Sequence, residues 1–179
     1  MSQALMTAEE LLRVDVPDKI TELVRGTLVV HEPPGFRHGE VMVRVVTILA
    51  RYVEEHHLGT VVTGDAGFVL ARNPDTVRGP DIAFVSRERV PHPTPVGYPD
   101  LAPDLGVEVL SPGNRAGEVL GRVADLLSAG TTLVWVIDPA RRLARVYRGD
   151  GSEDTVDADG ALDGEDVVPG FTCRLDSVL

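Results

Sequence analysis

The spacing of hydrophobic residues predicts two long amphipathic helices. Apolar positions in residues 37–57 recur at three- and four-residue steps and stop before Gly59. They are Val41, Val45, Leu49 and Tyr52. Residues 115–129 carry a second stripe, made of Val119, Leu120, Val123, Leu126 and Leu127. A short helix is also expected over residues 7–14, because Thr7 and Glu10 have the spacing of a capping box.

Short apolar runs between these helices predict β-strands. They are Glu22–Val24 and Thr27–Val30, joined at Arg25-Gly26, then Thr60–Thr63, Gly67–Leu70, the run after Asp81, the run around Glu108, "TTLVWVID" and "LARVYRG". "ARNPDTVRG" reads as a turn, and residues 86–103, with five prolines, read as a long surface loop. One or two weak strands are expected after residue 150. This order predicts an α/β protein with a central mixed sheet flanked by helices, forming a single domain over residues 1–179.

Composition adds limits on location and partners. The single cysteine, Cys173, excludes an internal disulfide, and with no signal-peptide pattern and no long apolar run the chain is expected to be cytoplasmic, without membrane association. The formal charge of −11 argues against a general nucleic-acid binder. However, the acidic C-terminal segment, residues 150–179, holds nine of the 28 acidic residues and one of the 17 basic residues. The body of the chain is therefore close to neutral.

Two carboxylates stand in runs that otherwise read as buried strand. Asp81 precedes "IAFV", and Glu108 lies between Val107 and Val109. A buried charge is costly unless it is paired, hydrated or bound to a metal. If the two strands are neighbours, both side chains reach one divalent cation at the edge of the sheet. The other interpretation is structural: Asp81 begins a strand after a turn, and Glu108 faces solvent.

The helix that follows Glu108 adds positive charge. At 100° per residue, Arg115, Glu118 and Arg122 share one flank of this helix, beside its apolar stripe, and two guanidinium groups there could hold phosphate oxygens. Asp125 is expected to point to water. Taken alone, these arginines would more often be solvated helix charges.

Four short motifs in order carry a family resemblance. "TELVRGTLVV", "GPDIAFVSRE", "DLGVEVLSPGNR" and "AGTTLVWVIDPARRLARVYR" resemble the bacterial Uma-type family of restriction-endonuclease-like proteins, within the PD-(D/E)XK nuclease superfamily. The resemblance implies a restriction-endonuclease-like fold. It also implies that Asp81 and Glu108 hold Mg²⁺ or Mn²⁺, that His38 is an auxiliary site residue, and that Glu22 is a weaker candidate.

The chain departs from this pattern at the lysine. Leu110 occupies the superfamily position, and the lysine of this family's following helix corresponds to Arg122. Arginine keeps the positive charge, but its pKa above about 12 prevents it from acting as a base.

Three functional hypotheses follow from these residues. The first is a metal-dependent endonuclease in which Asp81 and Glu108 hold the cation and Arg122 stabilises the phosphate, with His38 nearby. The second is a catalytically silent protein of the same fold that binds nucleic acid or protein. The third is a scaffold with this fold and no activity that assembles as a dimer, with which exposed apolar strand edges in the C-terminal segment are compatible. Under the first hypothesis the expected partner is nucleic acid, DNA rather than RNA. The chain is expected to form a homodimer.

Overall fold

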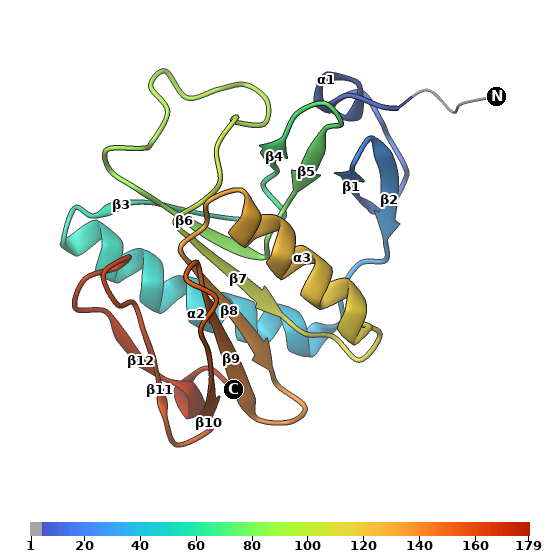
Figure 1. Ribbon diagram of the computed structural model, residues 1–179. Helices are drawn as coiled ribbons and strands as arrows, with labels where there is room; N and C mark the ends of the chain where they lie inside the picture. The colour runs from blue at the N-terminus through green and yellow to red at the C-terminus, as the bar shows by residue number, and fades with distance from the viewer. Residues whose placement is uncertain (1–4) are drawn as a thin grey trace.

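A six-stranded mixed sheet forms the centre of the computed structural model, which describes residues 5–179. Its order is β10 (Glu153–Asp157), β9 (Leu143–Arg148), β8 (Leu133–Asp138), β7 (Leu105–Val109), β6 (Ile82–Ser86) and β3 (Gly59–Thr63). β7 and β8 run parallel, and the other neighbours are antiparallel. The central strands β7 and β8 are buried along their whole length, which is typical of strands covered on both faces (Figure 1).

A second, four-stranded antiparallel sheet is built from the N-terminal hairpin and the segment after β3. Its order is β2 (Thr27–His31), β1 (Ile20–Val24), β5 (Thr76–Arg78) and β4 (Phe68–Ala71). Arg25 and Gly26 form the hairpin turn with φ of 48° and 75°. Positive φ at both residues lets a two-residue turn match the right-handed twist of the two strands. The short helix α1 (Ala8–Leu11) packs on this sheet through Ala8 and Leu11.

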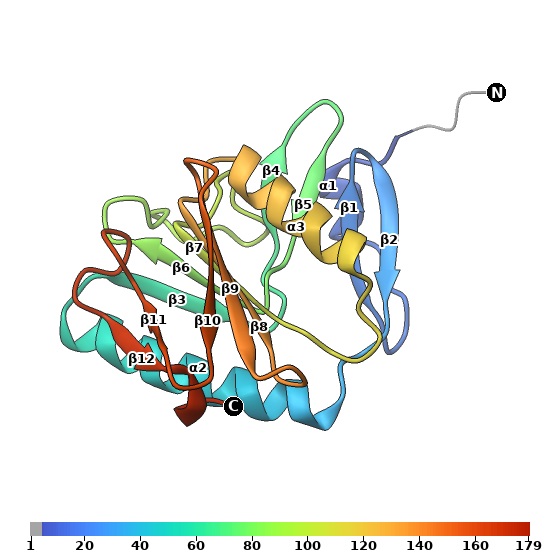
Figure 2. The ribbon, with the colours of Figure 1, turned by 60° about the horizontal axis from the view of Figure 1, so that its bottom comes forward.

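The helix α2 (Phe36–Glu55) covers one face of the six-stranded sheet (Figure 2). Its buried residues Val41, Val45, Leu49 and Val53 join side chains from β6, β7 and β8, among them Trp135. The C-terminal segment closes this core with the two-stranded pair β11 (Ala161–Asp163) and β12 (Thr172–Arg174) and the short 3₁₀ helix Leu175–Ser177. Cys173 is buried there, as a small apolar residue would be.

The helix α3 (Ala116–Ser128) connects β7 to β8 and covers the opposite face (Figure 2). Val123 and Leu126 are buried against Val134, Val136 and Tyr147. Only part of the predicted apolar stripe is in the core, because Leu120 faces solvent and is 49% exposed. The alternation of β7 thus sends Val107 toward α2 and its neighbour Glu108 toward α3.

Three expectations about the elements are corrected. Residues 76–78 form β5 rather than part of a turn, because Val77 pairs with both Leu23 and Val69. The segment after residue 150 contains three strands rather than one or two. The N-terminal hairpin enters a separate sheet, so the central sheet is not the only one. The loop after β6 contains neither helix nor strand up to β7, as predicted.

No helix within residues 5–179 combines the length and the apolar character that crossing a membrane requires.

Leu126→Ala tests how α3 is held on the sheet. Leu126 is fully buried, so its truncation should lower the free energy of unfolding by about 2–5 kcal/mol. The matched control is Leu120→Ala on the same helix, which should change stability by only about 0.5 kcal/mol. Urea unfolding measures both. Equal losses in the two variants would contradict the packing described for this helix.

Candidate active site

The register of β6 on β7 brings Asp81 and Glu108 together. Ile82 pairs with Val107, and one further step along both strands places Asp81 beside Glu108. The two side chains are only 12% and 9% exposed. Both carboxylates are therefore buried at the same end of neighbouring strands. Glu108 does not face solvent, whereas Asp81 directly precedes β6, as a strand-start residue also would.

Asp81 is fixed through both of its carboxylate oxygens. The backbone N–H of Val109 donates to Oδ2 at 2.6 Å, and Nε2 of His38 lies 3.2 Å from Oδ1. His38 comes from the first turn of α2, and its Nδ1 lies 2.8 Å from the carbonyl oxygen of Val109. Neutral imidazole has one N–H, and both partners are acceptors, so the two contacts are hydrogen bonds together only in the imidazolium form. Burial lowers the pKa of His38, but Asp81 and Val109 outweigh this effect and the net pKa is raised.

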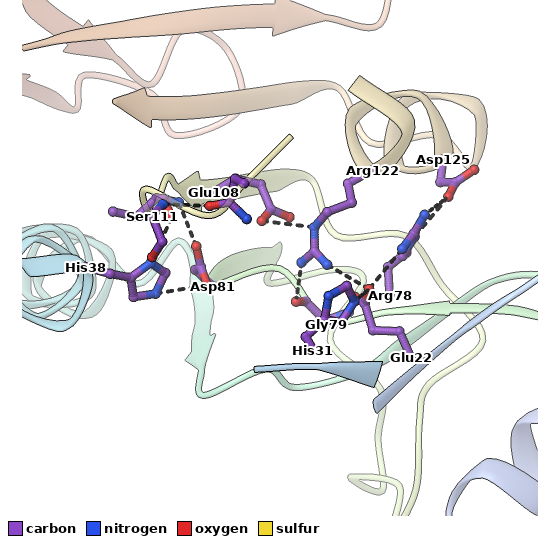
Figure 3. A network of polar contacts seen from close by, with 12 residues as sticks. Glu22, His31, His38, Arg78, Gly79, Asp81, Glu108, Ser111, Arg122 and Asp125 are labelled. Carbon is purple, nitrogen blue, oxygen red and sulfur yellow. Dashed lines mark hydrogen bonds and ion pairs between the residues drawn. The ribbon is translucent and has the colours of Figure 1, made fainter. Parts of the chain in front are cut away.

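Glu108 faces a guanidinium group from α3. Nε of Arg122 lies 3.2 Å from Oε2 of Glu108, Nη1 donates to Glu22 at 2.7 Å, and Nη2 donates to the carbonyl oxygen of Gly79 at 3.0 Å. The three nitrogens of Arg122 are thus all engaged with the protein (Figure 3). Burial raises the pKa of Glu108; Arg122 opposes this shift, and the nearby charge of Asp81 adds to it.

Glu22 connects this arginine to the rest of the cluster. Its side chain is 3% exposed and accepts from Arg78 at 2.9 Å, from Arg122, and from the N–H of Gly79 at 2.9 Å, with Nε2 of His31 also at 2.9 Å. Arg78 in turn donates to Asp125 on α3 at 2.7 Å. Burial alone would raise the pKa of Glu22, but these partners together lower it to about 2. Asp125–Arg78–Glu22–Arg122–Glu108 is a continuous chain of alternating charges (Figure 3).

The sequence-predicted site residues differ in where the structure places them. Asp81, Glu108, His38 and Arg122 converge, and Glu22 joins them. Arg115 caps α3 outside this cluster and is exposed. The expectation that Asp125 points to water is wrong, because its side chain is 19% exposed and binds Arg78.

Sequence reasoning missed Arg78, His31 and Asp65. Arg78 ends a strand that was taken for a turn, and only its pairing partners reveal the strand. His31 contacts Glu22 across the hairpin, where the register pairs it with Ile20. Asp65 follows β3; burial raises its pKa, and the charge of Asp81 adds to this shift. Asp65 follows Gly64 in the bend after β3, and both residues have positive φ, which the sequence does not show.

Asp81 and Glu108 suit a cation that takes few protein ligands. Within residues 5–179, no group of three or more His, Cys, Asp or Glu side chains is arranged to hold a metal ion. Mg²⁺ commonly uses one or two carboxylates and completes its shell with water and phosphate oxygens. The two buried carboxyl groups stand next to each other at the end of β6 and β7, so this donor set fits a hard cation such as Mg²⁺ or Mn²⁺.

Known proteins share the fold of this chain and match most of its sequence. The fold is that of a nuclease-like solved structure, described as "a putative nuclease belonging to DUF820" from Anabaena variabilis ATCC 29413. The two chains superpose with a TM-score of 0.84 at 19% identity, over 97% of each. Residues 8–176 match the Uma2 family model, described as "Putative restriction endonuclease". The chain therefore belongs to the Uma2 family, as its motifs indicated. No curated protein matches it.

Glu22→Gln tests the charge cluster through the pH dependence of stability. The pKa of Glu22 is depressed from 4.5 to about 2 in the folded protein. Its ionised carboxylate therefore stabilises the fold above the unfolded-state pKa of 4.5. This contribution, on the order of 3 kcal/mol, is lost as pH falls to the folded-state pKa of about 2. The variant should be less stable than wild type at neutral pH and should lose less stability on acidification. Urea unfolding at a series of pH values checks this.

Glu32→Gln is the control, because Glu32 is 78% exposed and pairs with Lys19 at the surface. It should follow the wild-type pH profile. If Glu22→Gln also follows that profile, the carboxylate of Glu22 does not have the stabilising role assigned to it.

Proposed function

We propose that this protein is a metal-dependent nuclease that hydrolyses phosphodiester bonds, of the PD-(D/E)XK type. The observation that carries the proposal is the pairing of Asp81 with Glu108 at one end of β6 and β7, with both side chains about nine-tenths buried. Membership of the Uma2 family, whose description names a restriction endonuclease, supports nucleic acid as the substrate. We expect DNA rather than RNA.

Asp81 and Glu108 would hold Mg²⁺ or Mn²⁺ in this proposal. When bound, such a cation polarises the phosphodiester and lowers the pKa of water. The protein's part is to keep the two carboxylates in place. Val109 and His38 hold Asp81 at both oxygens, so its carboxylate does not rotate freely. Side chains fixed in this way lose little freedom when a ligand binds.

Positive charge around the two carboxylates would attract phosphate groups. The N-terminus of α2 carries His38 into the cluster, and this helix has no side-chain N-cap. Free N–H groups at helix N-termini and nearby arginines favour anions. Burial lowers the pKa of Arg122, but the carboxylates of Glu108 and Glu22 outweigh this effect and the net pKa is raised. Arg122 therefore adds positive charge but does not transfer protons.

A catalytically silent nucleic-acid or protein-binding function is the second candidate. One observation favours it: every nitrogen of Arg122, which stands at the position of the family lysine, is engaged with Glu22, Glu108 or Gly79. The homodimer and the cytoplasmic location inferred from the sequence stay predictions.

Asp81→Asn tests the nuclease proposal directly. Wild type should cleave members of a panel of single- and double-stranded DNA and RNA in the presence of Mn²⁺. Removal of the Asp81 charge should slow cleavage by about 100-fold or more, because charge stabilisation in the site is lost. Asp18→Asn, an exposed aspartate in a turn before β1, should cleave like wild type, and circular dichroism should show both variants folded.

Unchanged cleavage in Asp81→Asn would exclude Asp81 from the site. Salt-sensitive nucleic-acid binding without cleavage by wild type would instead favour the silent protein.

A further inference from the structure

The guanidinium of Arg122 occupies a central position between two buried carboxylates. It lies 3.2 Å from Oε2 of Glu108 on one side and 2.7 Å from Oε2 of Glu22 on the other, and its side chain is 16% exposed (Figure 3). Its third nitrogen donates to the carbonyl oxygen of Gly79. Each of the three guanidinium nitrogens therefore has a partner inside the protein, and these contacts hold the group in place.

The contact with Glu108 is the longest of the three. The distance from Nε to Glu108 exceeds the distances from the Nη atoms to Glu22 and to Gly79. Glu22 is itself held by Arg78 and by the N–H of Gly79. The Nη side of the guanidinium is therefore anchored on a fixed carboxylate, while the Nε side faces Glu108 more loosely.

A divalent cation and Arg122 would both be attracted to the negative carboxylate of Glu108. Two positive groups beside one carboxylate repel each other, and this repulsion is strong where side chains are buried. Cation binding would therefore weaken the pair between Arg122 and Glu108, while the anchors on Glu22 and Gly79 stay in place.

We propose that Arg122 is a positioning residue that competes with the divalent cation for Glu108 and so sets the metal affinity of the site. This inference rests on the proposed function, because it places the cation on Asp81 and Glu108. The charge chain through Glu22 and Arg78 fixes Arg122 in this competing position. Arg122 then limits cation occupancy instead of serving as a free phosphate-binding arm.

Calorimetric titration with Mn²⁺, without nucleic acid, tests the competition. Arg122→Gln removes the competing charge and should bind Mn²⁺ tighter than wild type by about 10-fold or more, the size expected when a neighbour of a metal ligand changes. Arg122→Lys keeps a charge, but a single ammonium cannot span Glu22, Glu108 and Gly79 together. It should bind Mn²⁺ with an affinity between those of wild type and Arg122→Gln.

Arg115→Gln is the matched control, because it removes one positive charge from the start of the same helix, outside the cluster. Its Mn²⁺ affinity should equal that of wild type. Thermal melting followed by circular dichroism shows whether each variant is folded. If Arg122→Gln does not fold because Glu22 and Glu108 lose their partner, the comparison of Arg122→Lys with wild type decides the question.

The outcomes separate this inference from the proposed function. If Glu108→Gln abolishes Mn²⁺ binding while the Arg122 variants bind no tighter than wild type, the proposed competition is contradicted. The metal site at Asp81 and Glu108 is then still supported. An equal gain in Arg115→Gln would also overturn the competition. If wild type and Arg122→Gln both bind no Mn²⁺, or if binding survives in Glu108→Gln, both proposals fail. If Mn²⁺ binds to Arg122→Gln but not to wild type, Arg122 excludes the cation from the wild-type site, and the proposed competition is supported.

Discussion

The buried carboxylate of Glu22 joins the parts of the chain that form the site. It comes from the hairpin of the four-stranded sheet, and its partners come from β5, from the turn before β6 and from α3. A carboxylate at this depth is stable only when donors surround it, so its presence fixes where Arg78, Gly79 and Arg122 lie. The small sheet, the central sheet and α3 are therefore tied together at one charged group.

This arrangement also determines what surrounds Asp81 and Glu108. Gly79 is bound at its N–H by Glu22 and at its carbonyl by Arg122, two residues before Asp81. A side chain at Gly79 would meet the backbone of Asp65 at 2.6 Å, so the chain passes closely between the β3 end and the cluster. The position of Asp81 thus depends on the turn as well as on its contacts with His38 and Val109.

The sequence predicted the features that depend on local pattern. α2, α3 and β7 follow from apolar spacing, and Trp135 is in the core as a residue of "LVWVI" should be. The end of α2 differs by two residues because His57, rather than Gly59, is the left-handed residue that follows the helix. A glycine marks such an end in a sequence, whereas a histidine in the same conformation does not.

The features that the sequence did not predict depend on contacts between distant segments. Asp125 looks solvent-facing from helix geometry alone, and only the approach of β5 supplies Arg78 as its partner. β5 itself is three residues long and is defined by pairing with β1 and β4. Family motifs pointed to Asp81, Glu108, His38 and Arg122, but the way in which Glu22 restrains Arg122 follows only from the folded arrangement.

The most direct test of this account is a crystal structure of the protein soaked with Mn²⁺, with the cation located by anomalous diffraction. The account predicts one strong peak between the carboxylates of Asp81 and Glu108, with Arg122 still bound to Glu22 and farther from Glu108. A map with no peak at these two carboxylates, or with Mn²⁺ bound only elsewhere on the chain, would contradict it.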